Sequence, residues 1–353
     1  MSYNFQIQKI LVKTDTLGSS FLKLKLIRRA INIADINNDV EWGFDLRKRI
    51  IEEEMNTSSC MEGLPAFMWL LKIHKQYPEI CDESTFMPEY KWMIRTARQN
   101  ANVSMQQFED LVEDYKTRLQ RNGFSMHSYY TEKAQMAFQR RKLDEAKEYL
   151  ELRKSEERDE LSQCVACELH DLVEYELLSE NLDAAISISE KLFSGKECCD
   201  CIPFKTVCLV LKALDEQGCE DSADKLYEIV DSEMEKERDP CISNIGYVGN
   251  LIHYLTKRDK YKAWDMFEKY LVWSINCEDY HNFLFSSGSL SLFKGSGTCF
   301  LDAGPKIPWY KPSGIYELPE LYDYYKKQAA TLAARFDARN GSTSFTDELS
   351  SMD

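Results

Sequence analysis

Residues 129–155, YYTEKAQMAFQRRKLDEAKEYLELRKS, carry the pattern that decides the fold. Apolar side chains recur three and four residues apart on each side of a polar break at residues 140–142, and this spacing places each set on one face of a helix. The stretch therefore predicts two short amphipathic helices joined by a tight turn. Because helices of three or four turns cannot bury such faces alone, each hairpin should stack against a neighbour.

A similar unit returns three times before residue 280. Aligning the units places an alanine near the start of each second helix, at intervals of 39, 38 and 40 residues: Ala146, Ala185, Ala223 and Ala263. Twelve residues before each alanine lies an apolar residue of the first helix, in the order Ala134, Val173, Leu211 and Leu251. A small side chain suits the closest approach of two helices in a hairpin, and a bulky one suits the contact with the next hairpin. The sequence thus predicts four stacked hairpins.

The layout over roughly residues 125–280 resembles the tetratricopeptide repeat (TPR), although these units are longer than the usual repeat of about 34 residues and keep few of its glycine and proline positions. This resemblance implies an all-α, right-handed α-solenoid of TPR-like helical hairpins. A shorter resemblance, to bacterial TPR-like proteins, is carried by LAARFDARNG at residues 332–341 and by Cys201, Ile202 and Pro203 before a repeat. It implies a fold and a bacterial source, but no known activity.

The rest of the chain is organised around these units. Residues 1–124 contain about five helical segments and are predicted to be divergent hairpins of the same stack, or alternatively a separate helical bundle. Residues 281–316 are rich in glycine, serine and proline, which predicts a long irregular loop. Pro319 opens a C-terminal capping helix over residues 317–341, and residues 342–353 are predicted to be a flexible tail.

The composition fits a folded protein, since 44% of the residues are hydrophobic and 29% are charged. The net charge of −15 argues against a nucleic-acid partner, because neutralising phosphates requires a basic face. No apolar run is long enough to span a membrane, and the N-terminus lacks the features of a secretory signal. A cytoplasmic location is therefore expected, in which the twelve cysteines would be thiols or metal ligands rather than disulfides.

Two cysteine pairs are the sharpest candidate for a chemical site. Cys164 and Cys167 form one C-x-x-C motif, and Cys198 and Cys201 form another. Four thiolates are a common ligand set of structural zinc, and a repeat stack would bring the two helix ends side by side. Cys199 can take the place of Cys198. The alternative is that these cysteines are free thiols packed in the protein.

The sequence contains no recognisable catalytic motif. None of the five histidines lies three or four residues from another, so an H-E-x-x-H metal site is absent. The glycine-rich residues 294–298 lack the rest of a phosphate-binding loop, and residues 286–291 contain no G-x-S-x-G motif. We therefore expect a protein without enzymatic activity. A zinc-stabilised helical protein or a metal-dependent enzyme is the alternative if the cysteines bind a metal.

Because no catalytic motif is recognisable, the sequence favours recognition of a partner as the function. In TPR-like stacks the first helix of each hairpin lines a concave surface, which suits an extended or helical peptide. The repeat register places the following side chains there: Thr131, Gln135, Phe138, Cys167, His170, Glu174, Leu177, Lys205, Lys212, Asp215, Val248 and Ile252. Neighbouring helices or residues 283–316 could instead fill several of these positions.

The expected function is a protein- or peptide-binding scaffold. An immunity protein, another inhibitor or a peptide-sensing regulator with one tight partner is the alternative. The acidity of the chain favours a partner with a basic segment, because opposite charges speed association. The sequence predicts neither the partner's identity nor the oligomeric state.

Overall fold

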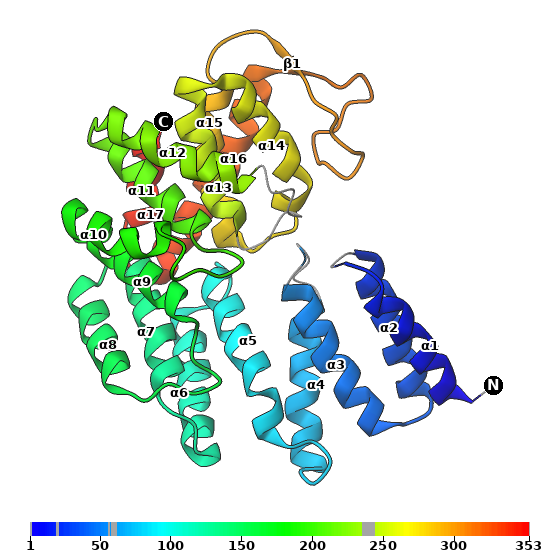
Figure 1. Ribbon diagram of the computed structural model, residues 1–353. Helices are drawn as coiled ribbons and strands as arrows, with labels where there is room; N and C mark the ends of the chain where they lie inside the picture. The colour runs from blue at the N-terminus through cyan, green and yellow to red at the C-terminus, as the bar shows by residue number, and fades with distance from the viewer. Residues whose placement is uncertain (1, 19–20, 56, 58–61, 235–243, 353) are drawn as a thin grey trace.

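The computed structural model describes residues 2–18, 21–55, 57, 62–234 and 244–352 (Figure 1). Within these residues the regular structure is almost entirely α-helical, as the sequence predicts, with seventeen α-helices and one two-stranded sheet. None of the described helices combines the length and the apolar character needed to cross a membrane.

The helices follow one another along the chain in pairs. The N-terminal part contains α1 (Tyr3–Asp15), α2 (Phe21–Ile36), α3 (Val40–Met55), α4 (Gly63–Gln76), the 3₁₀-helix η1 (Glu83–Phe86), α5 (Met87–Gln99) and α6 (Met105–Asn122). The four expected hairpins are α7 (His127–Gln139) with α8 (Leu143–Ser155), α9 (Val165–Leu178) with α10 (Leu182–Phe193), α11 (Phe204–Glu216) with α12 (Glu220–Met234), and α13 (Ile245–Arg258) with α14 (Lys260–Ser274). The C-terminal part contains α15 (Asp279–Phe293), β1 (Thr298–Phe300), β2 (Ile315–Glu317), α16 (Leu318–Asn340) and α17 (Ser344–Met352).

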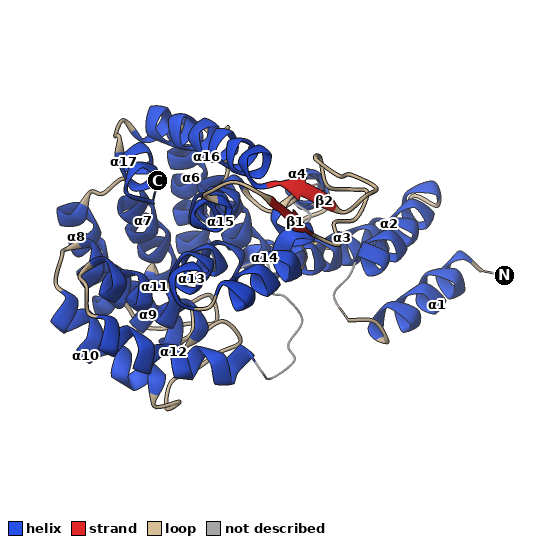
Figure 2. Cartoon of the chain, turned by 90° about the horizontal axis from the view of Figure 1, so that it is seen from above, coloured by secondary structure: helices blue, strands red, loops and turns tan. Residues whose placement is uncertain are grey.

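Two contact patterns run through these helices. From α7 onward, the first helix of each hairpin packs on the second, and the odd-numbered helices from α3 to α15 also contact one another in sequence. These odd-numbered helices form a row. The row is closed into a ring from α5 to α15, because α15 contacts α5 as well as α13. The helices α1 and α2 lie outside this closed part, at the opposite end of the molecule from α8 and α10 (Figures 1 and 2).

The four aligned alanines occupy equivalent positions. Each is the fourth residue of its helix, in α8, α10, α12 and α14, and each is fully buried. The turn before the helix is also repeated, since Arg141, Glu180 and Gly218 each lie two residues before a second helix and have φ of 54°, 58° and 70°. Asn38, with φ of 53°, holds the same place before α3. The turn that joins the helices of the middle units is therefore also present between α2 and α3.

The prediction of a loop over residues 281–316 was wrong for its first part, because residues 281–293 belong to α15, which is almost completely buried. A Cβ atom on Gly288 would lie 2.7 Å from the Cα atom of Gly249, so glycine allows α13 and α15 to cross at backbone contact. The Ser289 hydroxyl donates to the carbonyl of Phe285 at 2.7 Å, so this polar group is satisfied within the helix. The glycine and serine residues that are typical of a loop here belong to α15, a closely packed helix.

The irregular part of the C-terminal region is shorter than predicted and packs on the core. It lies between α15 and α16, from residue 294 to residue 317, and within it β1 pairs with β2 in antiparallel register, with Cys299 opposite Tyr316. The Tyr316 ring is buried, and the Trp309 ring lies against it edge-on at a centroid distance of 4.8 Å. The Trp309 ring also lies 6.3 Å from the ring of Tyr325 in α16, so the aromatic residues hold this segment against the helices.

The prediction of a flexible tail over residues 342–353 was also wrong, because most of this segment forms α17. The carboxylate of Asp337 in α16 accepts the backbone N–H of Phe345 at 3.0 Å and so caps the start of α17. The Phe345 ring stacks on Phe336 at a centroid distance of 4.7 Å. The predicted capping helix is present as α16, and α17 folds back onto it.

Candidate functional site

Side chains from six helices line a cavity of about 240 Å³. The helices α5, α7, α9, α11, α13 and α15 all contribute, so the cavity lies where the row of odd-numbered helices closes. A second hollow of about 510 Å³ adjoins it, and Glu174, Tyr247 and Tyr280 line both.

Most of the predicted partner-binding residues meet in these hollows. The cavity is lined by Thr131, Gln135, Phe138, Cys167, His170, Glu174 and Lys205. Leu177 and Lys212 join Glu174 in the second hollow. The repeat register therefore predicts which faces of α7, α9 and α11 line the two hollows.

Three predicted residues lie elsewhere. Val248 and Ile252 are completely buried because α11, α14 and α15 cover α13, so the prediction that these two residues contact a partner was wrong. Asp215 lines neither hollow, and its carboxylate is held by Lys257 at 2.6 Å and Arg258 at 3.0 Å. Burial opposes ionisation of Asp215, but its hydrogen bonds with these two cations lower its pKa below the usual value.

Sequence reasoning missed the side chains that other helices bring to the cavity. The helix α5 contributes Lys91, Arg95 and Arg98, while α13 and α15 contribute Tyr247 and Tyr280. The three cations are four and three residues apart, so their common helical face was visible in the sequence. Which helices that face would meet was not visible, because it depends on how the row of hairpins closes.

The carboxylates of the cavity carry less negative charge than their number implies. Asp171 is paired with Arg153 at 2.5 Å, and both side chains are buried. Burial, together with the nearby Asp171, raises the pKa of Glu174 to about 7. Burial also raises the pKa of Glu132. Two of the three carboxylates are thus harder to ionise than usual, and the third is neutralised by its partner.

The cations of the cavity are only partly neutralised. Arg98 lies 3.7 Å from Glu132 and donates to Gln135. Within the described residues, Arg95 and Lys205 have no carboxylate at ion-pair distance, and the Lys205 ammonium lies 5.6 Å from the centre of the Tyr247 ring. The interior therefore has an excess of positive charge, although the chain as a whole carries a charge of −15.

The two histidines of the cavity are neutral rings. His170 lies 2.9 Å from the Thr206 hydroxyl through Nδ1 and 3.1 Å from the Tyr247 hydroxyl through Nε2. Burial lowers the pKa of His170 to about 4, and burial together with nearby cations lowers that of His281. Because Thr206 is completely buried, its contact with His170 orients the ring and does not present a nucleophile to a substrate.

Several buried polar atoms of the cavity wall have no hydrogen-bond partner among the described residues. They are Arg98 Nε, Gln99 Oε1, Glu132 Oε2, Gln139 Nε2 and His281 Nδ1, on side chains that are at most 7% exposed. Arg98 Nε and Glu132 Oε2 face each other at 3.7 Å, which is ion-pair distance but too long for a hydrogen bond. Leaving such an atom unsatisfied costs about 1–3 kcal/mol. A cavity lined by these atoms is suited to hold water or a polar ligand group.

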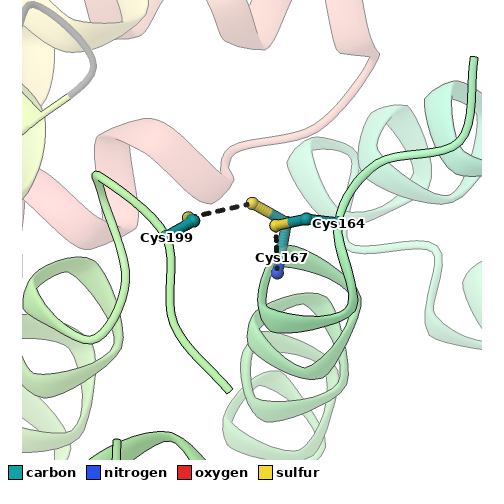
Figure 3. Close-up of side chains that lie close together, drawn as sticks. All are labelled: Cys164, Cys167 and Cys199. Atoms are coloured by element: carbon teal, nitrogen blue, oxygen red, sulfur yellow. Dashed lines mark hydrogen bonds between the residues drawn. The ribbon is translucent and has the colours of Figure 1, made fainter. Parts of the chain in front are cut away.

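A cluster of three thiols (Figure 3) shares Cys167 with the cavity wall. Cys164 and Cys167 at the start of α9 meet Cys199 from the loop before α11, and all three sulfur atoms lie within 4.8 Å of one another. The Cys167 and Cys199 sulfur atoms are 3.8 Å apart. Hydrogen bonding between these two thiols lowers the pKa of Cys199 to about 6, against the effect of burial, and raises the pKa of Cys167.

The predicted zinc ligands Cys198 and Cys201 are not part of this cluster. Backbone hydrogen bonds of 3.1 and 3.2 Å between Cys199 and Ile202 form a tight turn, and Cys198 before this turn is exposed. Cys199 therefore replaces Cys198, as the sequence allowed, and the cluster contains three of the expected four thiols.

No family model matches the chain, and no curated protein or solved structure matches it either. Function is therefore inferred from the cavity and the thiol cluster.

Proposed function

We propose that the protein is a non-catalytic binding protein that takes an anionic segment of a peptide or protein partner into the cavity enclosed by the odd-numbered helices α5 to α15. The TPR-like, right-handed superhelix implied by the sequence would give these helices a concave side. The observation that carries the proposal is the set of incompletely neutralised cations in the cavity wall, together with the buried donors Arg98 Nε and Gln139 Nε2, which have no hydrogen-bond partner among the described residues.

The charge of the cavity determines which chemical group it favours. The acidity of the whole chain leads to the expectation of a basic partner segment, but a basic side chain in the cavity would join four cations: Lys91, Arg95, Arg98 and Lys205. A carboxylate would instead pair with these cations in a poorly solvated space, where ion pairs are stronger than at the surface. It would also accept a hydrogen bond from Arg98 Nε.

The size of the cavity limits what enters. At about 240 Å³ it is smaller than the pockets of about 300–1,000 Å³ that hold drug-sized ligands, so it suits the end of a segment, such as a C-terminal carboxylate or one acidic side chain. The adjoining hollow also contains apolar side chains, including Leu177, Leu178 and Leu284, which suit the neighbouring residues of the segment. The two hollows share three lining residues, and we propose that one continuous segment occupies both.

Affinity capture with the intact chain, followed by cross-linking and mass spectrometry, tests this proposal. The double variant Arg95→Glu, Lys205→Glu reverses two charges in the cavity, and we expect it to capture at least about tenfold less partner than the wild-type protein. The control is Lys142→Glu, Lys147→Glu, which makes the same change of charge at two exposed residues. Equal capture by the two double variants would contradict the proposal.

The same experiment separates two kinds of binding protein. Recovery of a single partner in equal molar amount would favour an inhibitor, an immunity protein or a regulator with one cognate ligand. Recovery of several partners that share an acidic segment would favour a scaffold.

A metal-dependent enzyme is the second candidate, favoured by one observation: Cys167 belongs both to the thiol cluster and to the cavity wall. Three protein ligands with an open fourth position are typical of catalytic zinc sites. Undiminished partner capture after the metal is removed would favour the binding function over this candidate.

A further inference from the structure

The three thiols beside the cavity have the spacing of metal ligands. A tetrahedral zinc ion with zinc–sulfur bonds of about 2.3 Å holds its sulfur ligands about 3.8 Å apart. The Cys167 and Cys199 sulfur atoms are 3.8 Å apart, and Cys164 completes a set in which all three sulfur atoms lie within 4.8 Å of one another.

The backbone holds these cysteines in place from two sides. Cys164 is the N-cap of α9, and its sulfur accepts the backbone N–H of Cys167 at 3.4 Å. The positive end of the helix dipole favours thiolates at both positions. On the other side, the tight turn between Cys199 and Ile202 fixes the third cysteine through two backbone hydrogen bonds. Thiolates that are positioned before a metal arrives bind it with less reorganisation.

We propose that Cys164, Cys167 and Cys199 bind one zinc ion, which fastens the loop between α10 and α11 to the start of α9. Soft thiolate ligands select zinc over magnesium or calcium. A solvent molecule takes the fourth position, since no fourth histidine, cysteine or carboxylate joins the cluster in the described part of the chain. This site does not depend on the class of ligand that the cavity binds.

The wild-type protein provides the first test. The intact chain, purified under reducing conditions without a chelator, should contain close to one zinc ion per chain by elemental analysis. After removal of the zinc, added cobalt chloride should give the near-ultraviolet charge-transfer band of thiolate-bound cobalt. A zinc content below about a tenth of an equivalent together with no cobalt band would overturn the proposal. A disulfide between Cys167 and Cys199 in the freshly purified protein would overturn it as well.

Single substitutions then test the assignment of the ligands. Cys164→Ser, Cys167→Ser and Cys199→Ser should each weaken zinc binding by at least about tenfold. The matched controls are Cys198→Ser, which changes an exposed cysteine next to Cys199, and Cys219→Ser, an exposed cysteine outside the cluster. Circular dichroism shows whether each variant keeps its helices. Loss of zinc from folded Cys198→Ser with full retention by folded Cys199→Ser would overturn the assignment.

Discussion

A Cβ atom on Gly288 of α15 would lie 2.7 Å from the Cα atom of Gly249 in α13, so the two helices touch through their backbones. Because of this crossing, α15 packs between α13 and α16 and also contacts α5. Tyr280 and His281 at the start of α15 then form part of the cavity wall. The close approach of two glycines is thus tied to the closure of the proposed binding site.

Gly288→Ala should destabilise the protein strongly, because the added methyl group has no space at this crossing. We expect the free energy of unfolding to fall by about 3 kcal/mol or more, at the upper end of the usual cost of overpacking. Denaturant unfolding followed by circular dichroism measures the change. Gly304→Ala is the control, since a Cβ atom there meets no other atom within 4 Å. Equal unfolding midpoints for the two variants would contradict the described crossing.

The repeated alanines give a second prediction. Ala223→Leu should lower the free energy of unfolding by about 1–3 kcal/mol, because the larger side chain must enter the contact between the helices of one hairpin. Ala338→Leu, at an exposed position of α16, should change it by no more than about 0.5 kcal/mol. A stable Ala223→Leu variant would show that this position is not a close helix contact.

The stability of the protein should depend on pH through Glu174. The pKa of this residue is about 7 in the folded chain and about 4.3 in an unfolded chain, so between these values the unfolded state loses a proton that the folded state keeps. The contribution of Glu174 to stability is therefore present at low pH and is lost as the pH rises through this range.

Glu174→Gln, which cannot ionise, should remove this loss. The wild-type protein and the variant should differ little near about pH 4, and the variant should be the more stable of the two near about pH 8. Denaturant midpoints measured at both pH values provide the comparison. A difference that stays constant with pH would show that Glu174 has an ordinary pKa.

Chelation of the proposed zinc should lower the melting temperature of the wild-type protein by several degrees, because a ligand that binds the folded state stabilises it. The Cys199→Ser variant should show no such shift when the chelator is added. Differential scanning fluorimetry with and without the chelator measures both effects. An equal shift in the two proteins would place the metal somewhere other than at Cys199.

The sequence predicts the structural features that repeat along the chain or that follow helical periodicity. Helical spacing identifies α7 to α14, and one aligned small residue per unit identifies the positions of Ala146, Ala185, Ala223 and Ala263. The same spacing cannot identify α15, because the serine and glycine residues that allow its close packing against α13 are also those that favour loops.

The residues that line the cavity could likewise be predicted only in part from the sequence. The inner faces of α7, α9 and α11 follow from the register, but Arg95 and Tyr280 reach the cavity only because α15 returns to contact α5. That closure depends on small rotations between successive hairpins, which add along the chain and leave no local pattern. The choice of Cys199 over Cys198 likewise depends on a tight turn that residue spacing alone does not determine.

Site-specific photo-cross-linking tests the central claim, that a partner segment enters the cavity, most directly. Lys205 in the cavity and Lys147 on the exposed face of α8 would each be replaced, in separate preparations, by a photoreactive lysine analogue. Irradiation of the captured complex should give a cross-link from position 205, to a peptide with an acidic residue or a C-terminus at the attachment point, and none from position 147. Cross-links from position 147 alone would contradict the account.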